Sequence, residues 1–166
     1  GLLQVEFWPS LPSARYSLGQ QAKTVLSDAR ARIARLLAAK PAEIIFTSGG
    51  TESDNLALFG LTAAIEPGEV VVLPTEHQAV LQPLEQLRQR GFATHNAAVK
   101  STGEVDMAAL ARAITDTTLL VAISYVVSET GAVQPMHRIG QLLKQVRADR
   151  RAAGNTVPLY WHCDAS

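Results

Sequence analysis

Short apolar runs that alternate with amphipathic segments of helical length restrict the fold of this chain more than any other sequence feature. The predicted strands are 44–47, 70–73, 119–124 and 159–163, with a shorter one possible within 92–99. Helices are predicted over 22–37, 51–64, 77–90, 106–114 and 136–153, where apolar residues recur at steps of three and four. This alternation predicts an α/β fold in which a mostly parallel sheet is flanked by helices.

Composition and charge narrow the classes of function. The 166 residues are 47% hydrophobic, with a mean hydropathy of +0.08, which suits one soluble globular domain with a core. Fifteen basic residues balance fifteen acidic ones, so the sequence lacks the basic surface that nucleic acid or an anionic membrane would require. We expect no partner of either kind.

The single cysteine and the two ends of the chain indicate where the protein works and whether the sequence is part of a longer one. Cys163 has no second cysteine to pair with, and residues 1–10 lack the pattern of a signal peptide. These features favour a reducing, cytoplasmic location. Because the chain starts without methionine and stops directly after a predicted strand, we expect it to be a piece of a longer protein.

A paired-glycine turn joins the predicted strand 44–47 to the next predicted helix. Gly49 and Gly50 allow the backbone to approach a ligand closely, and the first amides of the helix point outward at its positive end. A phosphate suits such a position. Thr51, followed by Asp54, also has the composition of a helix cap. The segment alone fits a phosphate site and a ligand-free turn equally well.

Polar residues follow the other predicted strands at the edge of the sheet where ligands of open α/β folds gather. His77 starts a helix; a capping or surface role is the simpler interpretation, and a ring placed against a flat ligand is the alternative. Glu129 and Gln134 lie in a loop and are candidate site groups, although a polar loop that leads into the next helix explains them more simply.

The last predicted strand ends in a carboxylate. Asp164 should follow a central strand and pair with a cation or donor, such as a protonated ring nitrogen. Strand periodicity places His162 on the face of Asp164, where it either orients Asp164 or simply packs, and we favour packing. Cys163 faces the other way, and we expect a small buried apolar residue rather than a reactive thiol. The histidines and the cysteine show no metal-ligand spacing.

Five segments, in order along nearly the whole chain, carry recognisable motifs. They are PSARYSLGQQAK at 12–23, EIIFTSGGTESDNLALFG at 43–60, TEHQAVLQPLEQL at 75–87, ETGAVQP at 129–135 and HCDAS at 162–166. Together they resemble the pyridoxal-phosphate-dependent cysteine desulfurases and the related selenocysteine lyases of the aminotransferase class V group. The resemblance implies the amino-terminal half of the large domain of a fold type I transferase, which uses pyridoxal 5'-phosphate.

The resemblance also implies residue roles. Gly50 and Thr51 would bind the cofactor phosphate, and His77 would stack on the ring and take part in proton transfer. Asp164 would pair with the pyridine nitrogen and keep it protonated, so that the ring can act as an electron sink. The implied reaction removes sulfur from L-cysteine, or selenium from L-selenocysteine, and leaves L-alanine.

Two departures from the family pattern limit this transfer of roles. The family usually has two asparagines before the ETG triplet, where this chain has Val127 and Ser128. Ser128 can replace part of the cofactor contact, whereas the Val127 side chain cannot hydrogen bond. The lysine that carries the cofactor lies beyond the segment matched at 162–166, so we expect residues 1–166 alone to be inactive.

The resemblance finally implies an organisation and partners. Residues 1–16 would be a leading segment from the small domain or a domain junction, and 17–166 a partial cofactor-binding large domain. The longer protein would be a homodimer that delivers sulfur or selenium to an acceptor protein. Two alternatives stay open: a catalytically degenerate relative that acts as a binding or interaction protein, and an unrelated α/β module that binds a phosphorylated metabolite at residues 49–51.

Overall fold

The computed structural model of the protein describes residues 17–166, which divide into two compact units with the boundary in the chain between Thr47 and Ser48. The expected leading segment 1–16 lies outside the described residues. The expectation of one domain from residue 17 onward stays a prediction, and the two units are described separately. No helix in the described part of the chain is both long and apolar enough to cross a membrane.

The first unit contains helix α1 (Ser17–Leu36) and the 3-10 turn η1 (Pro41–Glu43). The strand predicted at 44–47 is wrong, because its backbone groups pair elsewhere: the amide of Ile44 donates to Pro41 O, and its carbonyl accepts from Arg30 Nε. The Arg30 guanidinium also lies 5.4 Å from the centre of the Phe46 ring. The segment is therefore held by α1 rather than by a neighbouring strand.

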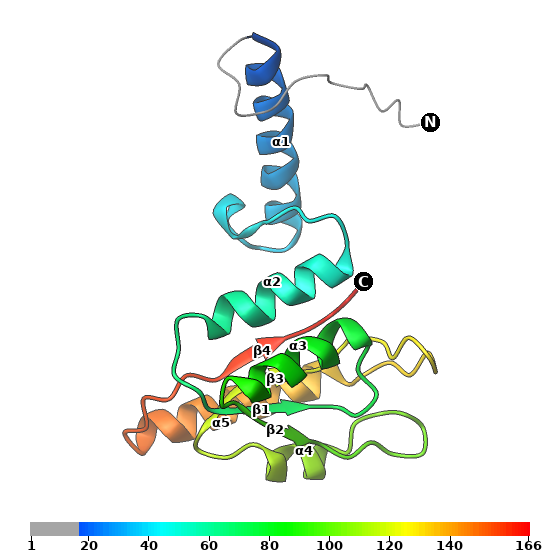
Figure 1. Cartoon of the computed structure of the whole chain (residues 1–166), viewed down its shortest axis with the longest axis vertical. Helices are drawn as coiled ribbons and strands as arrows, with labels where there is room; N and C mark the ends of the chain where they lie inside the picture. The colour runs from blue at the N-terminus through cyan, green and yellow to red at the C-terminus, as the bar shows by residue number, and fades with distance from the viewer. Residues whose placement is uncertain (1–16) are drawn as a thin grey trace. The chain divides into compact units, whose positions relative to one another are not determined.

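The second unit is a parallel sheet between two layers of helices (Figure 1). Its strands are β1 (Glu69–Val72), β2 (Ala93–Asn96), β3 (Thr118–Ala122) and β4 (Tyr160–His162). Its helices are α2 (Gly50–Thr62), α3 (Gln78–Gln89), α4 (Met107–Ala113) and α5 (Met136–Ala152). The remaining predicted strands and helices are thus confirmed, with ends shifted by a few residues.

The strand order is β2-β1-β3-β4, and each neighbouring pair is parallel. In register, Val71 pairs with His95 on one side and with Val121 on the other, and Val121 pairs with Trp161. The chain passes from β1 to β2 at one side and then returns to β3 at the other. The order therefore reverses between β1 and β3, which is where open α/β sheets bind ligands.

Alternate residues of β1 and β3 feed two separate cores. Val70 and Val72 pack with Leu58 of α2 and Leu84 of α3 on one face. Val71 and its neighbours on the same side of the sheet pack with apolar residues of α4 and α5 on the other face. Since both faces are covered, the strands read as continuous apolar runs rather than alternating ones.

Candidate functional site

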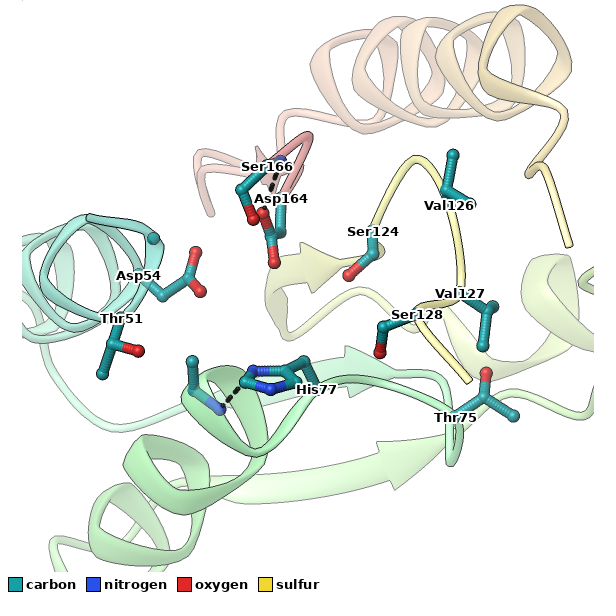
Figure 2. Close-up of a pocket in the computed structure, with 12 residues that line it drawn as sticks. Thr51, Asp54, Thr75, His77, Ser124, Val126, Val127, Ser128, Asp164 and Ser166 are labelled. Atoms are coloured by element: carbon teal, nitrogen blue, oxygen red, sulfur yellow. Dashed lines mark hydrogen bonds between the residues drawn. The ribbon is translucent and has the colours of Figure 1, made fainter. Parts of the chain in front are cut away.

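A polar pocket lies beyond the carboxyl ends of β1 and β3, at the reversal point of the sheet (Figure 2). Its volume is about 360 Å³, which is within the range of small-molecule sites. The walls come from segments far apart in the sequence: the start of α2, the turn before α3, the loop after β3 and the residues after β4. The lining residues are Gly50, Thr51, Asp54, Thr75, His77, Ala79, Ser124, Val126, Val127, Ser128, Asp164 and Ser166.

The start of α2 forms one wall. The expected cap at Thr51 is wrong: the helix already begins at Gly50, after the N-cap residue Gly49, and its first turn is fixed by Glu52. Glu52 Oε2 accepts hydrogen bonds of 2.6 Å from both the amide and the hydroxyl of Ser48, and these lower the pKa of Glu52. Thr51 consequently lies within the first turn, where helical amides have no intrahelical acceptor.

Gly50 makes a close approach to the chain end that follows β4. A Cβ atom at this position would lie 3.1 Å from Ser166 Oγ and 3.4 Å from Ser166 Cβ. Glycine lets these two parts of the pocket wall meet without displacing either. The positive end of α2 thus faces the pocket with little side-chain cover, which suits an anion.

His77 has the capping role that the sequence suggested, and it also lines the pocket. It is the N-cap of α3, and its Nδ1 accepts a 3.1 Å hydrogen bond from the amide of Ala79. The neutral ring therefore carries its proton on Nε2. Figure 2 shows the ring at the pocket floor, between Thr51 and Ser128. The cap bond fixes the ring while it faces the pocket.

Asp164 reaches the pocket from the segment after the last strand. Within residues 17–166, β4 is bonded only to β3, and the central position expected for this strand stays a prediction. The pairing continues past β4, because the amide of Tyr125 donates to Asp164 O at 2.7 Å. Asp164 Oδ1 accepts from the amide of Ser166 at 2.9 Å. The first bond thus fixes the backbone of Asp164, and the second fixes its carboxylate.

A buried pair lies behind Asp164. His162 Nε2 is 3.0 Å from Asp54 Oδ1, and the side chains are only 15% and 4% exposed, respectively. His162 therefore contacts α2 rather than orienting Asp164, which agrees with the favoured interpretation of a packed histidine. Burial, and then the charge of Asp164, raise the pKa of Asp54, whereas His162 lowers it. Asp54 is a pocket residue that the sequence analysis missed.

A second missed carboxylate is Glu76, which lies between two pocket residues in the TEH motif. It is 5% exposed and accepts hydrogen bonds from both the amide and the hydroxyl of Ser124. Burial raises the pKa of Glu76, and the bonds from Ser124 oppose that rise. The sequence signal was present, since a glutamate beside an apolar strand and a helix cap must find a partner when it is buried.

The loop after β3 supplies the opposite wall. Val127 is 3% exposed, and its side chain offers the pocket only methyl groups. Ser128 lines the pocket and donates to Glu129 Oε2 at 2.9 Å, which lowers the pKa of Glu129. Gln134 is buried in a structural role, since it accepts from the Val105 amide and donates to a backbone carbonyl. Neither Glu129 nor Gln134 lines the pocket.

Cys163 does not have the expected burial. Its side chain is exposed, because β4 is the edge strand of the described sheet. Trp161, two residues earlier on the same side of the strand, packs into the core formed with α4 and α5. The predicted alternation of faces is therefore right, and the predicted burial of Cys163 is wrong.

Two buried polar atoms in the pocket wall indicate how the pocket can bind a molecule. Asp54 Oδ2 and Thr75 Oγ1 are buried in the pocket wall without a hydrogen-bond partner. Buried polar atoms normally have one, so the wall offers bonds to a bound molecule. Across residues 17–166, no cluster of three or more His, Cys, Asp or Glu side chains is arranged to hold a metal ion.

Known proteins are similar to this chain in sequence and in fold. The chain is 43% identical over 138 residues to a cysteine desulfurase IscS of Vibrio cholerae, covering 82% of this chain and 34% of that protein. It is 38% identical over 135 residues to the IscS of Rickettsia felis, covering 80% and 33%. The chain thus spans about a third of these relatives.

Solved structures agree. The structure of SspA in complex with cysteine matches with a TM-score of 0.82 and 31% identity, over 95% of this chain and 43% of that one. DndA from Streptomyces lividans matches with a TM-score of 0.77 and 35% identity, over 92% and 40%. The sequence model described as "Aminotransferase class-V" matches residues 8–149. The chain therefore belongs to the aminotransferase class V family and is a homologue of its cysteine desulfurases.

Proposed function

We propose that the complete protein containing this chain is a pyridoxal-phosphate-dependent enzyme that removes sulfur from L-cysteine, or selenium from L-selenocysteine, and leaves L-alanine. One observation carries the proposal: a helix N-terminus opened by glycine, a fixed imidazole and a fixed carboxylate meet in one pocket at the reversal point of the sheet. They match the phosphate, the ring face and the ring nitrogen of this cofactor.

The pocket residues fit both the phosphate and the ring of pyridoxal phosphate. Gly50 and Thr51 would hold the phosphate against the positive end of α2. The His77 ring, fixed by the Ala79 amide, would cover one face of the cofactor ring. Asp164 would accept a hydrogen bond from the protonated ring nitrogen, and the bond from Ser166 leaves its second oxygen for that contact.

When bound, pyridoxal phosphate withdraws electrons from the α-carbon of an amino acid. Asp164 would support this chemistry by keeping a proton on the ring nitrogen, since a nearby carboxylate favours the charged form. His77 can move a proton at Nε2, because Nδ1 is engaged by the helix cap. Ser128 would contribute one polar contact, while Val127 would exclude water from the same wall.

The relatives support the choice of substrate class. Both IscS relatives are named cysteine desulfurases, and SspA is described in complex with cysteine. We extend this to a cytoplasmic homodimer that passes sulfur or selenium to an acceptor protein. In that protein, residues 17–166 would belong to the large cofactor-binding domain and residues 1–16 to a leading segment.

The test uses the complete open reading frame that contains residues 1–166. The purified protein should be yellow, and borohydride should fix the cofactor to a lysine outside residues 1–166. Alanine should form from cysteine or selenocysteine. Replacing Asp164 by Asn should lower turnover at least about a hundredfold, since loss of a charged partner in the transition state removes about 3 kcal/mol. A colourless protein that does not bind added cofactor would refute the proposal.

One structural feature favours a second candidate, a non-catalytic binding protein. Val127 places methyl groups in the pocket wall, at a position where the resemblance to the family implies an asparagine. The double substitution of Val127 and Ser128 by Asn in the complete protein tests this candidate. No gain of turnover in that variant favours a binding protein, whereas efficient turnover in the wild type excludes this candidate.

A further inference from the structure

Glu76 is a buried glutamate directly behind the pocket wall, between two residues that line it, and the proposed chemistry does not use it. It is 5% exposed, and its carboxylate receives three contacts from one residue, Ser124. The Ser124 amide is 3.1 Å from each of the two oxygens, and the Ser124 hydroxyl also donates to Oε2. A buried carboxylate with this set of donors is held in one orientation.

The two partners belong to different walls of the pocket. Glu76 lies between Thr75 and His77, in the turn that connects β1 to α3, and both of these neighbours line the pocket. Ser124 lines the opposite wall and begins the loop that continues to Ser128. Forty-eight residues separate the partners, so the contact is a tertiary link between two loops rather than part of either one.

The bonds between Glu76 and Ser124 lie where the loops after β1 and β3 leave the sheet. β1 and β3 are neighbours in the sheet, and the strand order reverses between them. Ladder bonds hold the two strands together only as far as Val72 and Ala122. Beyond these residues the loops diverge around the pocket, and Glu76 and Ser124 form the next connection.

The surrounding charges explain why the link needs a polar partner. Asp54 and Asp164 both face Glu76 closely enough to raise its pKa, as burial also does. The amide and hydroxyl of Ser124 supply the hydrogen-bond donors of Glu76 within this group of three carboxyl groups.

We propose that Glu76 is a positioning residue: its bonds to Ser124 set the distance and tilt of His77 relative to the loop 124–128, and thereby the orientation of a ring bound between them. This proposal rests on the proposed function only for the identity of that ring. The link itself is a property of the chain and can be tested without any cofactor.

The experiment compares three variants with a matched control in the complete protein. Glu76→Ala removes the link, Glu76→Gln keeps its shape and part of its bonding, and Ser124→Ala removes one donor. The control is Glu85→Ala, which deletes an exposed glutamate from α3, the helix that follows Glu76, where it pairs with Arg88 at 2.7 Å. Amide hydrogen exchange is measured without cofactor, and then the dissociation constant and induced circular dichroism of added pyridoxal phosphate.

In Glu76→Ala, exchange should accelerate at least about tenfold in residues 75–79 and 124–128 together, because a hydrogen bond to a charged group is lost. Cofactor affinity should fall about tenfold or more, with an altered dichroism band that reports ring tilt. Glu76→Gln should recover most of both signals. Glu85→Ala should change neither, since exposed pairs contribute little.

Several results would overturn the proposal. Unchanged exchange and unchanged dichroism in Glu76→Ala would do so, as would loss of protection in only one of the two loops. If Glu76→Ala fails to fold, Ser124→Ala decides: a change that does not reach residues 75–79 refutes the link. If the wild type binds no pyridoxal phosphate while the loops respond together, the proposed function fails and the positioning role stands.

Discussion

The buried pair of Asp54 and His162 gives the sharpest test of the electrostatics behind the pocket. Their side chains are 4% and 15% exposed, and the bond between them is 3.0 Å. The second oxygen of Asp54 has no hydrogen-bond partner. We predict that replacing His162 by Phe, which keeps a ring of similar shape, destabilises the protein by leaving both Asp54 oxygens without a donor.

The magnitude follows from burial. Removing one partner of a buried ion pair costs about 3 to 5 kcal/mol when the remaining group stays charged. Asp54 can become neutral by binding a proton, and its pKa is already raised above the ordinary value of 3.8 by burial and by Asp164. We therefore expect a loss of about 3 kcal/mol at pH 8. In an Asp54→Asn background the same substitution should cost about 1 kcal/mol, which gives a coupling of about 2 kcal/mol.

The pH dependence has a definite sign. A carboxyl group whose folded pKa is raised contributes stability below its unfolded pKa and loses it as the pH rises through the folded value. Removing His162, which lowers the pKa of Asp54, raises that value further. The cost of His162→Phe should therefore shrink as the pH falls from 8 through the raised pKa of Asp54 in the variant, by at most about 1.4 kcal/mol per pH unit.

Urea unfolding of the cofactor-free protein at several pH values measures these quantities. The matched control is the cycle of Glu85→Gln and Arg88→Gln, an exposed pair at 2.7 Å that should couple by less than about 1 kcal/mol. A coupling below about 0.5 kcal/mol between Asp54 and His162, together with a cost that does not vary with pH, would refute the reasoning.

Three further predictions concern other residues. His77→Asn should keep the cap and the thermal stability but lose the induced dichroism of bound cofactor, whereas His77→Ala should also lose about 1 kcal/mol; equal stability of the two variants would contradict the cap. Gly68→Ala should destabilise by about 1 to 3 kcal/mol in thermal melts, since its Cβ would lie 2.5 Å from Leu119 Cδ1, while Gly60→Ala in an open helical position should stabilise by up to about 1 kcal/mol; a loss at Gly60 would count against this account. Arg150→Met should lower the free energy of unfolding by about 3 kcal/mol in urea, because the buried guanidinium donates to carbonyls at the start of β3 and in the segments that precede β3 and β4; a neutral result would show that water replaces these bonds.

The sheet and its helices could be predicted because each element carries its own periodicity. The valines of β1 alternate between two cores, and each covering helix shows a stripe at helical spacing. The segment 44–47 has the same local character but forms no strand, since the Arg30 side chain engages its backbone carbonyl and stacks on Phe46. Local composition cannot show which partner a backbone group will choose.

The candidate site was partly predictable for a related reason. Gly50, His77 and Asp164 stand directly after apolar runs, and parallel strands bring such positions to one edge of the sheet. Asp54 and Glu76 were missed because their partners are distant in sequence, and a polar residue within a helix or turn usually faces water. Cys163 is exposed because it follows β4, which pairs with only one strand within residues 17–166. The order of strands in a sheet cannot be read from local sequence patterns.

The bond between Asp54 and His162 also sets an order of events during synthesis. Its two residues are 108 positions apart, and the chain leaves the ribosome from its amino end. At typical elongation rates the wall from α2 is made about 5 to 20 s before the residues that complete it. The residues of the α2 end are therefore synthesised well before the Asp164 carboxylate, and the walls of the pocket are complete only after β4 has paired with β3.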